Sequence, residues 1–387
     1  MQPLRGVKVL DLSRLLPGPF ASLILADLGA QVDKVEDLNG GDYLRHFPPQ
    51  IGDQSGAFLA LNRGKRSACL DLKKPRAQGA FLKMVERYDV VLEQFRPGVL
   101  DRLGLSHATL RERNPKLIVC ALTGYGQTGP LAHKAGHDIN YLARSGVLGM
   151  QGPAEAPPQM MAVQLADMSG GLWSALAILA ALQERSRTGV GQVLDVAMVE
   201  ASMGFAFYGF GNLFAGQVPE RGNEPLTGGL AIYNAYFSKD GQAMTLGALE
   251  PKFWSAFCAG VGLEADMSAL LPGPHQLALK AKLAEIFANR TRAEWESFSQ
   301  SHDCCLEPVL RPDELRTDPH LAARGVFFEM DSPWGKLTQL RTPLTPPTSE
   351  ATFAPPPRQG EHTDAILREC GIDDETIALL RSEGAAR

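Results

Sequence analysis

Short apolar segments alternate with helical patterns along the first two hundred residues, and this alternation constrains the fold most strongly. Strand-like segments cover residues 7–12, 31–36, 89–95, 116–122 and 193–196. Helical patterns cover residues 20–29, 75–87, 106–113, 168–185 and 197–215. Such alternation predicts an α/β fold with a Rossmann-like parallel sheet covered by helices on both faces. Ligands of such sheets bind at the carboxyl ends of the strands, so we expect a site around residues 13–19, 94–98 and 123–140.

A different pattern begins after the Gly-, Pro- and Asn-rich stretch at residues 216–230. Residues 233–237 and 243–248 flank a Lys-Asp-Gly turn, which predicts a β-hairpin, and three helical patterns follow it. A chain of 387 residues suits two domains. We predict a large α/β domain over residues 1–215, completed by residues 326–387, and a smaller α+β domain over residues 225–325.

Composition excludes several classes of protein. The net charge of -5 argues against nucleic-acid binding, and the six scattered cysteines indicate neither a disulfide framework nor a metal site. The N-terminal segment lacks the apolar centre of a signal peptide. The most apolar helical segment, residues 171–182, is expected to be too short to cross a bilayer. We therefore expect a cytoplasmic protein without a membrane or nucleic-acid partner.

Basic residues gather in one segment that suits a phosphate-bearing ligand. Arg63, Lys65, Arg66, Lys73, Lys74 and Arg76 lie within fourteen residues of this acidic chain. Lys and Arg recognise phosphate by charge and by hydrogen bonds, although a solvated basic surface explains the composition equally well. Arg96 and Arg102, beside the strand end at Phe95, favour the ligand.

The turn after the first strand argues against common nucleotide-binding motifs. It reads Leu-Leu-Pro-Gly-Pro in place of GxGxxG, and prolines lack the N–H groups that hold a pyrophosphate. The sequence also lacks a GxxxxGK[ST] motif. Nicotinamide, flavin and P-loop enzymes are therefore disfavoured.

Three residues could carry acid–base chemistry. His137 follows Gly136 in a loop after a predicted strand, although a lone histidine is more often structural. Asp167 precedes a helix whose N-cap it could be, and whose free N–H groups could stabilise an enolate oxygen. Glu250 precedes Pro251 at another helix start, where glutamate is a poor cap. A histidine and a carboxylate that face each other could remove and return a proton on opposite faces of one carbon, as a racemase requires.

Several motifs together resemble one known family. They are residues 4–12, 17–19, 26–30, 34–36, 62–67, 95–98, 122–130 and 191–198. As a set they are similar to the family III CoA transferases and racemases, the CaiB/BaiF superfamily, and the match runs from residue 4 to about residue 365.

This resemblance implies one of two chemistries. Transferases of the family use an aspartate at the position of Asp167 as a nucleophile, and commonly carry a longer glycine-rich loop where this chain has Thr227-Gly228-Gly229. The α-methylacyl-CoA racemase branch has a Gly-His-Asp-Ile-Asn-Tyr motif, an aspartate and a Gly-Ala-x-Glu-Pro motif. Here these are residues 136–141, Asp167 and Glu250. The resemblance therefore implies an isomerase of lipid metabolism with His137, Asp167 and Glu250 as catalytic residues, and a CoA transferase as the alternative.

The resemblance also implies where CoA binds. The matching positions are Leu70, Asp71, Leu72, Lys73, Gln94, Phe95, Arg96, Arg102, Lys134, Ala135, Gly136 and Asp138, and the basic segment adds Arg63 and Lys65. One departure is Asp37, where some racemases have an arginine. No metal and no cofactor beyond the CoA moiety of the acyl-CoA substrate are expected. The family fold implies an interlocked homodimer in which Glu250 approaches His137 from the other subunit.

Overall fold

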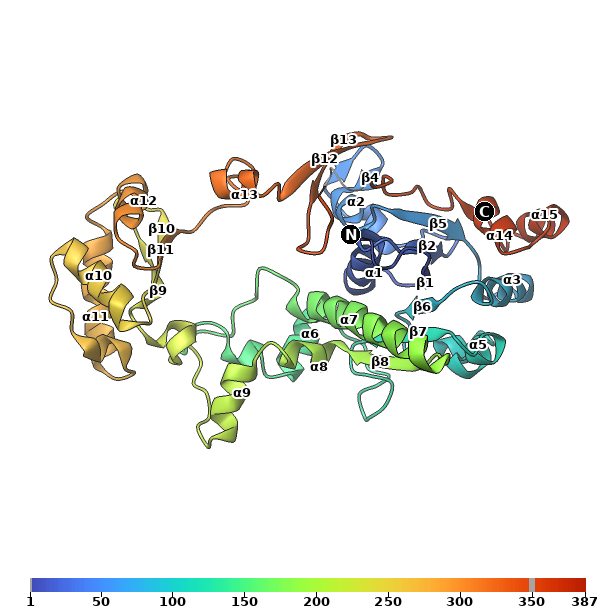
Figure 1. Ribbon diagram of the computed structural model, residues 1–387. Helices are drawn as coiled ribbons and strands as arrows, with labels where there is room; N and C mark the ends of the chain where they lie inside the picture. Colours follow the sequence, from blue (N-terminus) through green and yellow to red (C-terminus); the bar gives the residue numbers. More distant parts are fainter. Residues whose placement is uncertain (1, 348–351) are drawn as a thin grey trace. The chain divides into compact units, whose positions relative to one another are not determined.

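Two compact units make up the part of the chain that the computed structural model describes, residues 2–347 and 352–387 (Figure 1). The first unit combines Met1–Ser145, Val163–Phe205 and Pro319–Arg387, and the second combines Gly146–Ala162 and Ala206–Asp318. The expected boundaries differ from this division at residues 146–162 and 206–215, which lie with the second unit. Residues 319–325 lie with the first.

A six-stranded parallel sheet forms the centre of the first unit (Figure 1). Its strands are β1 (Lys8–Asp11), β2 (Gln31–Glu36), β5 (Lys65–Cys69), β6 (Val90–Glu93), β7 (Ile118–Thr123) and β8 (Val193–Ala197). Their spatial order is β5-β2-β1-β6-β7-β8. This is the doubly wound arrangement: the chain adds strands on one side of β1 as far as β5, then returns and adds β6, β7 and β8 on the other side. The predicted α/β class with a Rossmann-like sheet is confirmed.

Helices cover both faces of this sheet. On one face α1 (Pro17–Asp27) packs against α7 (Leu165–Thr188) so closely that a Cβ on Gly171 would lie 2.4 Å from the carbonyl oxygen of Pro17. The helix α1 begins at Pro17, three residues before the expected start, because proline suits the first turn of a helix. The other helices of the first unit are α2 (Gly56–Leu61), α3 (Pro75–Val85), α4 (Val99–Arg102), α5 (His107–Arg113), α6 (Asp138–Arg144), α8 (Met198–Met203), α13 (Pro319–Ala323), α14 (Thr363–Glu369) and α15 (Asp374–Ser382).

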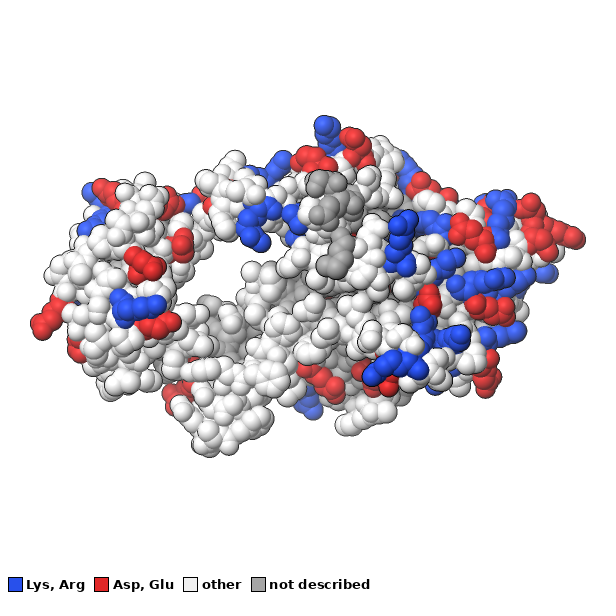
Figure 2. All heavy atoms as spheres, viewed as in Figure 1, with Lys and Arg blue, Asp and Glu red and all other residues white. Residues whose placement is uncertain are grey.

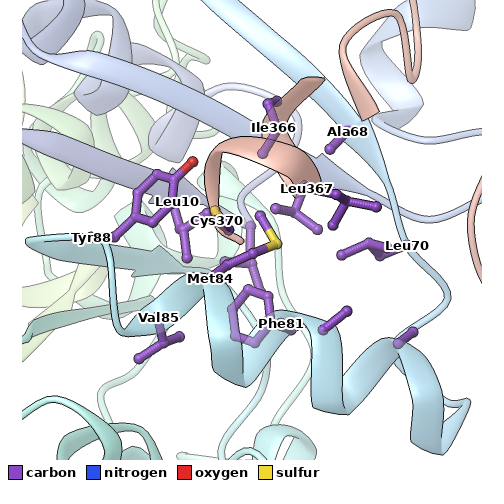
Figure 3. Packing of buried hydrophobic residues seen from close by; sticks show 14 of the residues in the cluster. Leu10, Ala68, Leu70, Phe81, Met84, Val85, Tyr88, Ile366, Leu367 and Cys370 are labelled. Atoms are coloured by element: carbon purple, nitrogen blue, oxygen red, sulfur yellow. The ribbon is translucent and has the colours of Figure 1, made fainter. Parts of the chain in front are cut away.

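The C-terminal segment completes the core on the opposite face. Phe81 and Met84 of α3 lie in one buried cluster with Leu367 of α14, Cys370 at the end of that helix and Leu10 of β1 (Figure 3). The first unit is therefore closed by residues more than 350 positions from its first strand. Two short hairpins, β3 (Gln50–Ile51) with β4 (Gln54–Ser55) and β12 (Phe327–Ser332) with β13 (Gly335–Leu340), complete the unit.

The helix α7 is longer than the sequence pattern predicts. It has 24 residues and is long and apolar enough to cross a membrane by length and composition alone, so the expectation that it is too short is wrong. Its small residues Ser169, Gly170, Ser174 and Ala175 are buried, which is the pattern of a helix packed on a protein core.

The second unit carries an antiparallel sheet of β9 (Tyr233–Phe237), β10 (Ala243–Gly247) and β11 (Leu306–Pro308). The predicted hairpin is β9–β10. Its helices are α9 (Phe207–Phe214), α10 (Pro251–Val261), α11 (His275–Phe287) and α12 (Arg292–Ser301). Phe257 stacks on Trp254 and on Phe287 in an aromatic core, with ring centroids 5.8 Å apart in both pairs. The helix expected over residues 197–215 is interrupted between α8 and α9 at Gly204–Ala206.

Two of the basic residues expected to bind phosphate lie inside the first unit. Arg63 is fully buried, pairs with Asp27 at 2.6 Å and donates to Gln339. Lys65 is buried as well and donates to the carbonyl of Pro19 at 2.9 Å. Their placement among the CoA-binding residues is therefore corrected, because both cations are shielded from a ligand by their internal partners.

The exposed members of the basic segment also have partners. Arg66 pairs with Asp33 and Glu369, and Arg76 pairs with Glu383. Cations and carboxylates accordingly alternate on the surface over α3, α14 and α15 (Figure 2). The segment therefore ties the sheet to the C-terminal helices.

Replacing Arg63 by Met should destabilise the protein by about 3 kcal/mol, because the carboxylate of Asp27 would stay buried without its cation. The midpoint of urea unfolding measures this loss. The matched control is Arg76→Met at an exposed pair, whose midpoint should stay close to that of the wild type. Adding Asp27→Leu to Arg63→Met should recover much of the stability, and an unchanged midpoint in Arg63→Met would contradict the structural role.

Candidate active site

Two adjoining hollows open at the carboxyl end of the sheet, where the strand order reverses. The larger, about 710 Å³, extends from Asp37 and Tyr43 past Leu70–Lys73. The smaller, about 170 Å³, is lined by His137 and Asp167. Leu15, Gln94, Phe95 and Arg96 line both hollows. Together they form one continuous groove, which we call the β1–β6 groove, and it lies where the sequence predicted a ligand.

His137 is placed by the start of α6, immediately before the first helical residue. Its backbone N–H donates to the side-chain oxygen of Asn140 at 3.0 Å, which fixes the entry into the helix. Gly136 permits this approach, because a Cβ there would lie 2.7 Å from the ring of Tyr141. The Tyr141 hydroxyl donates to the carbonyl of Gly136 at 2.5 Å. The imidazole is therefore presented to the groove from a rigid turn.

Asp167 lies in the first turn of α7 and faces the same hollow. Burial, and then the negative charge of Asp138, raise the pKa of the Asp167 carboxyl to about 7. The structure thus brings the His137 imidazole and a carboxyl with a pKa of about 7 into one hollow. Such a pair can remove a proton from a carbon acid and return it.

Asp138 connects the two helices that carry these groups. Its Oδ1 accepts hydrogen bonds from the backbone N–H of Ala166 at 2.7 Å and from that of Asp167 at 3.2 Å. The expectation that these α7 amides are free to hold an enolate oxygen is therefore wrong, since Asp138 occupies them. Burial raises the pKa of Asp138 while these same amides lower it.

Most of the predicted CoA-binding residues line the β1–β6 groove. They are Leu70, Asp71, Leu72, Lys73, Gln94, Phe95, Arg96, Lys134 and Gly136. Ala135 is an exposed residue between two of them. Arg102 is exposed on α4 and is not among the described residues that line either hollow. Asp37, the departure from the family pattern, lines the larger hollow.

The residues after β1 that line the groove were not identified individually from the sequence. Leu15 has a φ of 64°, which is rare for a residue with a side chain, and its N–H donates to Asp42 Oδ1 at 2.9 Å. Arg14 lies over the ring of Tyr43 at 4.9 Å. The only sequence signal for these residues is their position in the loop expected to bind ligands.

Buried charges hold the walls of the groove. Lys34 pairs with Asp42 at 2.9 Å and donates to the carbonyl of Ser13 at 2.6 Å. Burial lowers the pKa of Lys34, but Asp42, Asp11 and Glu36 outweigh it and raise the pKa overall. Arg45 donates to both oxygens of Glu36, at 2.7 and 2.8 Å. These pairs fix the loops after β1 and β2.

Glu250 belongs to the second unit. It is the exposed N-cap residue of α10, and its side chain makes no capping hydrogen bond. Burial, and then the charge of Glu250, raise the pKa of the neighbouring Cys305 thiol. Within residues 2–347 and 352–387, no group of His, Cys, Asp and Glu side chains is arranged to hold a metal ion.

Known proteins resemble this chain along nearly its whole length. Human alpha-methylacyl-CoA racemase is 40% identical over 393 residues, which cover 98% of this chain and 96% of the relative. Human succinyl-CoA:glutarate CoA-transferase is 31% identical, with coverage of 99% and 90%. The crystal structure of a CAIB/BAIF family protein from Brucella suis superposes with a TM-score of 0.81 at 31% identity, and covers 95% of this chain and 99% of that one.

The family model of the CoA-transferase family III matches residues 4–363. Since this match spans both units and includes every strand of the parallel sheet and both His137 and Asp167, the chain belongs to the CoA-transferase family III.

Proposed function

We propose that the protein is an acyl-CoA racemase or epimerase that interconverts the R and S forms of a 2-methylacyl-CoA. The observation that carries this proposal is the shared hollow of His137 and Asp167, with a carboxyl pKa of about 7. The racemase name of the human relative at 40% identity supports it.

The proposed reaction is a proton transfer at one carbon. The thioester makes the α-proton removable, and one of His137 and Asp167 takes it while the other returns a proton to the opposite face. The enolate between these steps carries a negative charge. Because Asp138 occupies the α7 amides, we assign the balancing positive charge to Arg96 and Lys134, which line the same hollow.

We further propose that Glu250 orients His137 from the partner subunit of an interlocked homodimer. Its support is the exposed carboxylate at the start of α10, where glutamate is a poor cap and makes no capping bond. A carboxylate beside an imidazole would fix its tautomer and raise its pKa. We also propose that the reaction needs no cofactor beyond the CoA moiety and serves lipid metabolism in the cytoplasm.

The second candidate is a CoA transferase with Asp167 as nucleophile. The carboxylate would attack the thioester carbonyl, forming an acyl anhydride and releasing the CoA thiolate. Relatives named as CoA transferases at 31–34% identity favour it. A carboxyl with a pKa of about 7 is partly protonated at neutral pH, however, and a protonated carboxyl is a poor nucleophile.

Incubation with a 2-methylacyl-CoA in deuterated water, without an acceptor acid, should place deuterium at C2. The His137→Gln variant should lose at least about a hundredfold of this exchange rate, because one proton carrier is missing. The matched control is His133→Gln, an exposed histidine four residues away, which should exchange like the wild type. If the wild type incorporates no deuterium at C2 of several different acyl-CoA substrates, the racemase proposal is wrong.

The transferase candidate predicts a different outcome. The wild type would then move CoA to an added carboxylic acid, and hydroxylamine would trap the Asp167 anhydride as a hydroxamate that mass spectrometry locates. His137→Gln need not abolish that transfer. Transfer without exchange at C2 would favour the transferase.

Replacing Asp138 by Asn should move the pH dependence of exchange to lower pH. The amide oxygen can still accept from the α7 amides, but loss of the neighbouring charge lowers the pKa of Asp167 from about 7. In the direction in which Asp167 is the base, kcat/KM rises with pH through this pKa, and in the reverse direction it falls. In Asp138→Asn, the rising profile of the first direction and the falling profile of the reverse direction should both shift to lower pH. An unshifted profile would show that Asp138 does not set the proton affinity of Asp167.

A further inference from the structure

Several cations near the larger hollow are held by other residues of the first unit. Arg63, Lys65, Lys34 and Arg45 are buried with internal partners. Arg66 and Arg76 pair with carboxylates, and Lys74 donates to the carbonyl of Glu383. The cations that line the larger hollow are Arg14, Lys73 and Arg96.

Arg14 is held in the wall of this hollow by two aromatic rings. Its guanidinium carbon lies 4.9 Å from the ring centroid of Tyr43 and 5.8 Å from that of Phe95. In residues 2–347 and 352–387, Arg14 has no carboxylate partner. Stacking orders a guanidinium while it leaves the N–H groups at its edge free to donate.

The loops that carry these two rings are held by hydrogen bonds and an ion pair. Tyr43 follows Asp42, whose Oδ1 accepts from the N–H of Leu15 and whose other oxygen pairs with Lys34. The N–H of Phe95 donates to Glu93 at 2.7 Å. Arg14, in the loop after β1, is therefore stacked on rings from the loops after β2 and β6, and all three loops are held in place.

The nearby carboxylates divide into two groups. Glu36 and Asp42 are neutralised from inside by Arg45 and Lys34. Asp37 and Asp71 also line the hollow, and accept from the backbone N–H groups of Asn39 and Lys73. An anionic ligand would be repelled near Asp37 and Asp71, and would be attracted to the part of the groove where Arg14 is stacked.

We propose that Arg14, stacked on Tyr43 and Phe95, is the residue that recognises a phosphate of the bound CoA in the larger hollow. This inference rests on the proposal that the β1–β6 groove takes an acyl-CoA. Arg14 is better suited than Lys73, because its planar donors match phosphate oxygens and are already ordered, whereas Lys73 is exposed on a flexible stem.

Calorimetric titration of the full chain with free CoA tests the proposal. Arg14→Met should weaken CoA binding by about tenfold or more, as expected for the loss of a charge-assisted hydrogen bond. It should also flatten the dependence of the dissociation constant on NaCl concentration, because one screened attraction is missing. Arg14→Lys should retain most of this salt dependence with weaker binding. The matched control Arg76→Met should bind CoA like the wild type.

Titration with 3′-dephospho-CoA distinguishes the two sources of phosphate. If Arg14→Met loses the same affinity for both ligands, Arg14 contacts the diphosphate. If it loses affinity for CoA alone, Arg14 contacts the 3′-phosphate. Both outcomes support the proposal. CoA affinity within twofold of the wild type in Arg14→Met would overturn it, as would a weaker affinity with an unchanged salt dependence. Because free CoA is used, this result is independent of whether the wild type exchanges the α-proton.

Discussion

The buried ion pair between Lys34 and Asp42 is the contact on which the groove most depends. One oxygen of Asp42 pairs with Lys34 of β2. The other accepts the N–H of Leu15 in the loop after β1, and that of Leu44 in the short helix that follows Asp42. Both charges are removed from water, so hydrophobic residues of similar volume could give equal stability. What a hydrophobic pair could not supply is the directional bond that keeps Leu15 at a positive φ. We therefore infer that this pair is retained for the shape of the groove more than for stability.

The sheet topology explains why these charges lie beneath the site. The strand order reverses between β1 and β6, so the loops after these two strands diverge and leave a crevice. Glu36, Lys34 and Asp11 lie at the carboxyl ends of neighbouring strands, where each can reach the loop of the next. The same strand ends thus provide the crevice and the charges that fix its walls.

The fold could be predicted from the sequence because its signals are local. The strands β1, β2, β6, β7 and β8 are short strand-like segments between helical patterns, and the hairpin β9–β10 has a Lys-Asp-Gly turn. The roles of Arg63 and Lys65 could not be predicted, because Asp27 and Gln339 reach Arg63 from distant parts of the chain. A basic run looks the same in sequence whether its cations meet phosphate or internal carboxylates. The pairing of Asp138 with the start of α7 was not predicted either, because its partners Ala166 and Asp167 are also distant in sequence.

The environment of Asp167 suggests how one scaffold can support either chemistry. An aspartate in the first turn of a helix is ordinarily stabilised as a carboxylate by the free amides and the helix dipole, which suits a nucleophile. Here Asp138 takes the amides of Ala166 and Asp167 and adds a second negative charge. Burial then acts against the charged form with little opposition, and the pKa rises to about 7. A carboxyl with this pKa can both take and give a proton near neutral pH, which is the property that the proposed racemase reaction requires of Asp167.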